Sequence, residues 1–144
     1  MPRWCILAIL LALALPAGAA KDESLEQLVK RAQEARVQDQ PSLYVQAAQR
    51  QLKAADELYT AGKVDDARRA VEDVVTYADR ATAAASKSGK KLKGTEIAVR
   101  KMAERLRDMK RTLAFDDQAP VQAAADHLEK MRTELLSRMF GSKD

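Results

Sequence analysis

The sequence predicts an all-α protein, an up-and-down antiparallel helical bundle of four long helices preceded by a short N-terminal helix. Three observations support this fold class. Apolar residues recur at alternating steps of three and four along separate segments, which is the spacing of one buried helix face. Short connections with Gly, Pro or polar residues separate the segments, and such connections favour antiparallel neighbours. No alternating run of β-branched residues marks a strand.

Five helices are expected in chain order, each defined by its apolar spacing. These apolar positions run from Leu25 to Ala32, from Tyr44 to Tyr59, from Val64 to Ala85, from Val99 to Leu113 and from Val121 to Met139. The third segment keeps a heptad rhythm without a break, and its second half is lined with Ala. Small side chains there allow a neighbouring helix to approach closely.

Particular residues indicate where the helices begin. Asp39 is expected to cap the second helix and Asp117 the fifth, with Pro41 and Pro120 in the respective first turns. The fourth helix could extend backward to residue 92. That extension stays open, because Gly94 within a helix costs about 1 kcal/mol relative to Ala.

Other residues indicate how the first helix begins and where helices end. Ser24 and Gln27 fit a capping box at the start of the first helix, and the polar stretch at residues 38–41 ends it. Gly62 is expected to end the second helix and Gly141 the fifth. The third helix should end within residues 86–89.

The first twenty residues have the anatomy of a secretory signal peptide. Arg3 precedes an apolar run from Trp4 to Leu15, and Pro16 and small residues follow it. The run is too short for an uncleaved membrane anchor, since a spanning helix needs roughly 20 apolar residues. We therefore expect residues 1–20 to be removed and residues 21–144 to form a single exported domain, periplasmic or extracellular.

Cleavage would remove Trp4 and Cys5, the only Trp and the only Cys of the chain. Cys5 stands at the front of the apolar run rather than just after it, which argues against a lipid anchor. The mature protein would have no disulfide, so its apolar core alone must stabilise it. No later apolar run is long enough to span a membrane.

One stretch resembles a known family. From Gln51 to Val75 the chain has small Ala55, apolar Leu58, Gly62 at a turn, then Val64, small Ala67, Val71 and Val74. This pattern resembles a single tetratricopeptide-type helical hairpin, in which small residues let two helices pack closely. Gln51 stands where that family prefers a bulky aromatic, no closing Pro follows and no second copy is present. An ordinary helical hairpin that meets the same packing problem is the alternative.

The residues that most catalytic sites require are missing from the mature sequence, so we expect no enzyme, no cofactor and no metal site. His127 is the sole histidine, and no Cys survives processing to serve as a nucleophile or a zinc ligand. His127 is expected to flank the core rather than enter it. Four methionines fall on the apolar faces and are interpreted as core residues: Met102, Met109, Met131 and Met139.

Positive charge is concentrated in the fourth helix. The formal net charge of the chain is +4, and loss of Arg3 leaves +3; residues 90–111 alone carry +6, so the rest of the mature chain carries −3. Four of these cations are expected to share an outward face: Lys93, Arg100, Arg107 and Arg111. A solvated face supported by pairs of Arg100 and Arg107 with Glu104 is the alternative interpretation. Ile97 projects to the same side, where it meets either the first helix or a partner.

These features favour a non-enzymatic exported helical adaptor that presents its bundle surface to a protein partner in the envelope. The alternative is a binder of anionic envelope material, an acidic polymer or a lipid headgroup, through the basic face of the fourth helix. No glycine-rich phosphate loop and no basic motif interleaved with aromatic residues points to specific nucleic-acid recognition.

The first prediction concerns processing. The mature chain should begin at Ala20 or Lys21, because small residues behind Pro16 suit a signal peptidase. Intact-mass measurement of the protein recovered from the cell envelope or the medium checks this. Exported material that retains Trp4 and Cys5 would contradict it.

Overall fold

The computed structural model describes residues 23–141, so the predicted signal peptide at residues 1–20 lies outside the described part. Within residues 23–141 the chain forms five α-helices and no strand, which confirms the all-α class and the short N-terminal helix. The helices are α1 (Leu25–Glu34), α2 (Gln40–Thr60), α3 (Val64–Ser88), α4 (Leu92–Arg111) and α5 (Phe115–Phe140). None of these five helices is long and apolar enough to cross a bilayer.

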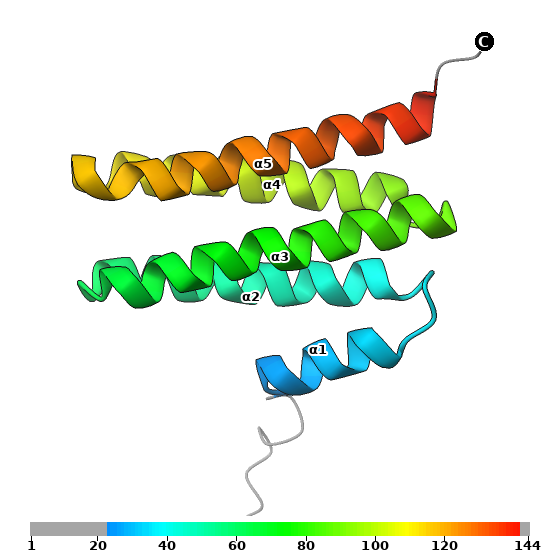
Figure 1. Ribbon diagram of the computed structural model, residues 1–144, viewed down its shortest axis with the longest axis horizontal. Helices are drawn as coiled ribbons and strands as arrows, with labels where there is room; N and C mark the ends of the chain where they lie inside the picture. Colours follow the sequence, from blue (N-terminus) through cyan, green and yellow to red (C-terminus); the bar gives the residue numbers. More distant parts are fainter. Residues whose placement is uncertain (1–22, 142–144) are drawn as a thin grey trace, which may run out of the picture.

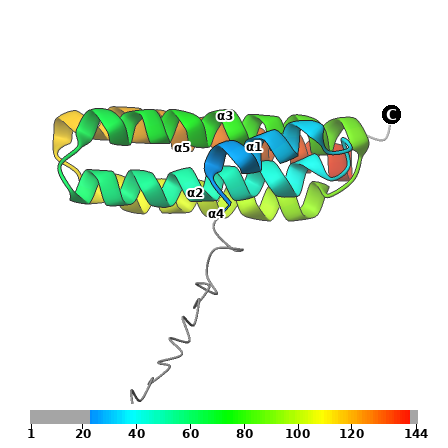
Figure 2. The same ribbon diagram turned by 90° about the horizontal axis from the view of Figure 1, so that it is seen from below.

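Consecutive long helices run antiparallel, as predicted, and they pair into two stacked hairpins (Figure 1). α2 packs along α3 and α4 packs along α5, and these are the most extensive helix contacts. The hairpins stack so that α3 lies beside α5 and α2 beside α4 (Figure 2), whereas α2 and α5 make no close approach. Because the chain reverses at each connection, both stacked pairs run parallel. α1 packs against α2, away from the α4–α5 hairpin.

Several predicted helix ends are confirmed. The backbone N–H of Gln27 donates to Ser24 Oγ at 3.1 Å and that of Ser24 donates to Gln27 Oε1 at 3.0 Å, which completes the capping box of α1. Gly62 and Gly89 follow α2 and α3 with φ angles of +75° and +68°. This left-handed conformation strains residues with a β-carbon, so glycine stops both helices at little cost. Gly141 follows the last residue of α5.

The predicted caps at the two aspartates are wrong. Asp39 occupies the N-cap position of α2 and Pro41 lies in the first turn, as predicted, but the Asp39 carboxylate accepts a hydrogen bond from Arg36 Nε at 2.9 Å and does not cap the helix. α5 begins earlier than expected, at Phe115, and the backbone N–H of Asp117 already donates to Ala114 O at 2.9 Å. Asp117 therefore lies within the first turn, and Pro120 lies inside the helix rather than in its first turn.

Two other helix boundaries differ from the sequence pattern or resolve it. α1 ends at Glu34, before the polar stretch that was expected to end it. α4 begins at Leu92, so the backward extension is present and Gly94 lies within the helix. Space around Gly94 is open, because a β-carbon there would have no heavy atom within 4 Å.

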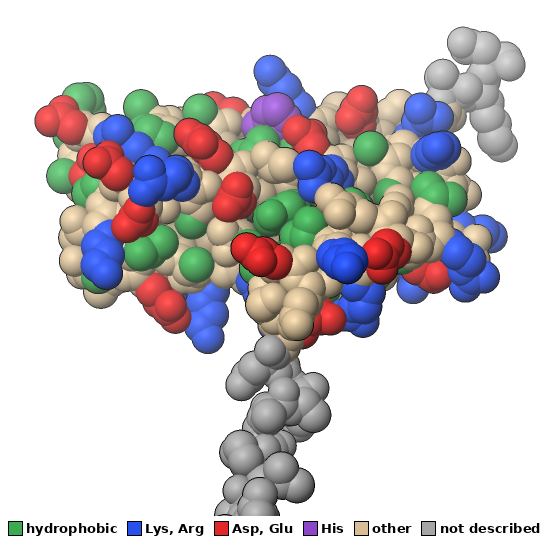
Figure 3. Space-filling model, turned by 60° about the horizontal axis from the view of Figure 1, so that its bottom comes forward, with side chains coloured by type: hydrophobic (Ala, Val, Ile, Leu, Met, Phe, Trp, Pro, Cys, Tyr) green, Lys and Arg blue, Asp and Glu red, His purple; other side chains and the backbone are tan. Residues whose placement is uncertain are grey.

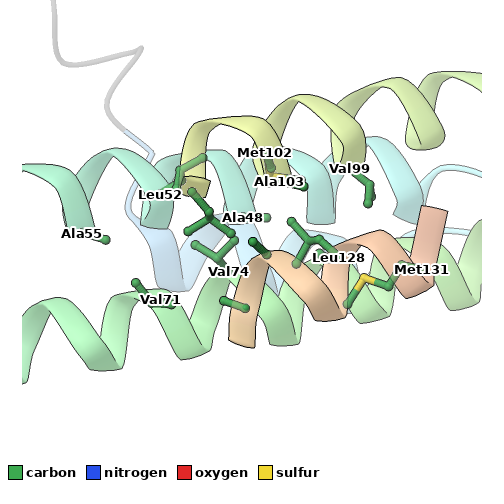
Figure 4. Packing of buried hydrophobic residues seen from close by; sticks show 14 of the residues in the cluster. Ala48, Leu52, Ala55, Val71, Val74, Val99, Met102, Ala103, Leu128 and Met131 are labelled. Carbon is green, nitrogen blue, oxygen red and sulfur yellow. The ribbon is translucent and has the colours of Figure 1, made fainter. Parts of the chain in front are cut away.

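The core differs in side-chain size between the two hairpins. Half of the buried apolar side chains in the described residues are alanine, and most of these alanines lie on α2 and α3. The α4–α5 hairpin contributes larger side chains: Val99, Met102, Leu106, Met109, Val121, Leu128, Met131 and Leu135. Figure 4 shows Leu52, Val74, Met102 and Leu128 meeting between the four long helices. Close approach of the helices stabilises the first hairpin, and apolar area stabilises the second.

The second prediction concerns this core. Leu106 is fully buried on α4, so Leu106→Ala should lower the free energy of unfolding by about 2 to 5 kcal/mol, through lost apolar area and the cavity left behind. Chemical denaturation measures the change, with Lys101→Ala on the exposed side of α4 as the control. A loss below about 0.5 kcal/mol for Leu106→Ala would show that this position is not core.

Candidate functional site

The predicted basic face lies along α4, and its cations are largely paired with carboxylates. The four predicted residues are Lys93, Arg100, Arg107 and Arg111. Arg100 lies 3.7 Å from Glu96 Oε1 and 3.8 Å from Glu104 Oε1, the latter being one of the expected pairs. Arg111 Nη1 lies 3.2 Å from Asp108 Oδ1. These pairs lie within one helix and reduce the charge available to a ligand, and those of Glu104 and Asp108 are exposed enough to contribute little to stability.

Arg107 makes a different pair from the one expected. Its Nη2 atom lies 3.2 Å from Glu129 Oε1 on α5, not beside Glu104. Arg107 therefore lies at the boundary between α4 and α5, which a projection of α4 alone could not show. Lys93 is exposed and makes no ion pair with a carboxylate in the described residues. Three of the four predicted cations thus have acidic partners.

Ile97, the apolar residue of this face, is half-buried. α1 packs against α2 and does not approach α4, so the first helix does not cover Ile97. Of the two expectations for Ile97, contact with the first helix is wrong. Contact with a partner stays a prediction.

Glu96 is a buried carboxylate that the sequence did not single out. It is 7% exposed and accepts a hydrogen bond from Arg132 Nε on α5 at 2.9 Å. Arg132 also lies 3.6 Å from Glu129. The hydrogen bond to Glu96 raises the pKa of the Arg132 guanidinium above its already high value. This network joins α4 to α5. It depends on how the two helices are aligned along each other, which the sequence of either helix alone does not show.

A second candidate surface is an open groove of about 600 Å³ between α3 and α5. Its floor and walls are apolar, and charged side chains stand at its rim. The apolar residues are Val71 and Val75 of α3 with Pro120, Ala123 and Ala124 of α5, and the rim residues are Arg68, Glu72 and His127. Figure 3 views the molecule obliquely, with His127 in purple at its upper edge, and shows apolar side chains exposed between charges of both signs.

His127 lies beside this groove and does not enter the core, as predicted. Its side chain is 49% exposed, and Nε2 lies 3.3 Å from Asp79 on α3. The pair bridges α3 and α5. No group of three or more His, Cys, Asp or Glu side chains suited to a metal ion occurs within residues 23–141.

Polar atoms lie unused near one end of the groove. Arg68 Nη2 lies 3.6 Å from Asp117 Oδ1, while the buried Arg68 Nε and the buried hydroxyl of Tyr59 have no hydrogen-bond partner in the described protein. Burial raises the pKa of the Tyr59 phenol, Arg68 lowers it and Asp117 raises it further. The phenol is therefore neutral at physiological pH and can donate a hydrogen bond.

The third prediction tests the Glu96 network. Arg132→Gln should lower the melting temperature more than Glu96→Gln, because the first change leaves a buried carboxylate with only the longer contact to Arg100. In Glu96→Gln the buried group is neutral and can still accept from Arg132. Thermal unfolding followed by circular dichroism compares the variants, with Glu104→Gln as the exposed control. No loss in either variant would show that the pair does not hold α4 to α5, and an equal loss in both would contradict the penalty expected for the buried Glu96 carboxylate.

Comparison with known proteins adds no relative from which a role could be taken. No family model matches this chain, and neither a curated protein nor a solved structure matches it. Any function assigned to the groove or to the α4 face therefore depends on residues and geometry alone.

Proposed function

We propose that this protein is an exported, non-enzymatic helical adaptor that docks a helix of a protein partner in the groove between α3 and α5. The observation that carries the proposal is the groove itself. Val71, Val75, Ala123 and Ala124 give it an apolar floor, and no other described helix packs over it. Apolar surface left open along two helices favours occupation by another apolar surface.

The shape and chemistry of the groove suit an amphipathic helix. Ala123 and Ala124 are small, so the backbone of a docked helix can come close to α5. Apolar side chains spaced three and four residues apart on the partner would fill the floor. Arg68 and Glu72 offer opposite charges at the rim, which favours a partner helix with both signs along its flanks.

Export belongs to this proposal because it depends on the predicted signal peptide, which lies outside the described residues. The partner would then be a protein of the envelope or the extracellular space. An adaptor needs no catalytic group, and the sequence offers neither a Cys nucleophile after processing nor a second His.

The alternative, a binder of anionic envelope material through α4, stays a prediction. The ion pairs of Arg100, Arg107 and Arg111 weigh against it, because a polyanion would have to compete with built-in carboxylates. The apolar floor of the groove, by contrast, is not covered by any other described helix with which a partner would have to compete.

The fourth prediction places a photo-crosslinking amino acid at Glu72, on the groove rim, in the full chain expressed in its own cells. The crosslinker at this position should capture one protein, and the crosslink should map to the apolar face of an amphipathic helix in that protein. A synthetic peptide of that helix should bind the purified adaptor. Ala123→Arg should reduce the crosslink yield by about tenfold or more, because it places a long charged side chain in the apolar groove.

Two controls make this test specific to the groove. Thr133→Arg adds the same side chain at an exposed position farther along α5, and it should leave the crosslink yield unchanged. The same photo-crosslinker at Glu57, exposed on α2, should capture little of the same protein. Equal capture from Glu57, an unchanged yield in Ala123→Arg, or crosslinks to a segment that is not helical would overturn the proposal.

A further inference from the structure

A separate hollow of about 550 Å³ lies between the α1–α2 connection and the outer side of α3. It is distinct from the adaptor groove and faces away from α5. Apolar side chains line one part of it, from Val37, Ala83 and Ala84, and polar side chains line the other, from Gln40, Arg80 and Lys87. A ligand here would meet both an apolar wall and two cations.

Arg80 is exposed and lies beside two aromatic rings. Its guanidinium carbon lies 5.8 Å from the ring centroid of Tyr44 and 5.8 Å from that of Tyr77. A cation–π contact at this distance favours a guanidinium near the rings and leaves its N–H groups free. Burial raises the pKa of the Tyr77 phenol, as does Asp73, whereas Arg80 lowers it, so the ring beneath Arg80 is neutral at physiological pH.

The positive charge of this hollow is not compensated by ion pairs. Neither Arg80 nor Lys87 forms a salt bridge in the described part of the chain, in contrast to Arg100, Arg107 and Arg111 on α4. Asp39 directly precedes Gln40, Asp79 directly precedes Arg80 and Asp73 acts on Tyr77, but none of these carboxylates forms an ion pair with Arg80 or Lys87 in the described residues. Asp39 pairs with Arg36 at 2.9 Å, and Asp73 accepts a hydrogen bond from Gln51 at 2.8 Å.

We propose that this hollow, the Arg80 site, binds a phosphate group carried on a small apolar body. A planar guanidinium matches the spacing of two phosphate oxygens, and Lys87 supplies a second positive charge for a dianion. The Gln40 amide adds a neutral donor, and Val37, Ala83 and Ala84 contact the apolar part of the ligand. The ligand is therefore a phosphomonoester, either a free small molecule or the headgroup of a phospholipid.

The fifth prediction tests this site by nuclear magnetic resonance titration of the mature chain with phenyl phosphate at constant ionic strength. Binding should saturate, and the largest amide shifts should fall on residues 37–40 and 80–87. Inorganic phosphate should shift the same amides with weaker affinity, because it has no apolar part to contact Ala83 and Ala84.

Charge variants decide whether the cations of the site bind the phosphate. Arg80→Gln should raise the Kd for phenyl phosphate by about tenfold or more, the size expected for loss of a charged hydrogen bond. Lys87→Gln should also weaken binding, and Arg80→Lys should only partly restore it, because an ammonium lacks the planar fork. Lys101→Gln removes one charge from the exposed side of α4 and should leave the Kd unchanged. Thermal unfolding verifies that every variant is folded.

A third arm distinguishes the source of the phosphate. The mature chain is mixed with phosphatidylcholine vesicles that do or do not contain phosphatidic acid, a phosphomonoester lipid, and cosedimentation is measured. Binding to phenyl phosphate that depends on Arg80 indicates a free ligand, and binding only to phosphatidic acid that depends on Arg80 indicates the lipid. Lack of saturable binding in both arms, or equal binding by Arg80→Gln and Lys101→Gln, would overturn the Arg80 site and leave the adaptor proposal untouched.

Discussion

The arrangement of the molecule depends on the unequal size of the buried side chains in its two hairpins. Alanines between α2 and α3 let these helices lie close together, but each alanine removes little apolar surface from water. The larger side chains on α4 and α5, such as Leu106 and Leu128, supply the area that holds one hairpin on the other. Pro120, Ala123 and Ala124 of α5 instead line the groove between α5 and α3. Side-chain size along the helices therefore affects both the packing of the two hairpins and the candidate docking surface.

The exposed cations in the described part of the chain fall into two groups, those with carboxylate partners and those without. On α4 the arginines pair with carboxylates of their own helix, of α2 or of α5, and the Glu96–Arg132 hydrogen bond joins α4 to α5. Arg80 of α3, by contrast, lies beside the rings of Tyr44 and Tyr77, and its N–H donors have no carboxylate partner in the described residues. A high local charge in the sequence therefore does not show whether its cations already have carboxylate partners, because the packing of the helices decides this.

Much of the fold could be predicted from the sequence, because helical periodicity and glycine at helix ends are local properties. Most apolar positions of α3 and α5 are buried as expected, but Val64 and Met139 at their outer ends are only half-buried, so Met139 is not the core residue it was expected to be. Gly62 and Gly89 end their helices. Sequence reasoning failed where an interaction joins two helices. Arg107 pairs with Glu129 rather than Glu104, and buried Glu96 needs Arg132 from α5. The groove and the Arg80 site could not be predicted for the same reason, since their walls come from separate elements.

The groove depends on α3 lying beside α5, because these two helices line it, while α1 packs elsewhere, against α2. Nuclear Overhauser effects between assigned methyl groups of the mature chain test that pairing directly. Contacts from Val71 and Val74 of α3 to Ala124 and Leu128 of α5 are the expected result, whereas α2 should reach α5 only through side chains of the central core such as Leu52. Absence of the α3–α5 contacts, as in a bundle whose first and last long helices are neighbours, would contradict the stacked hairpins and the groove with them.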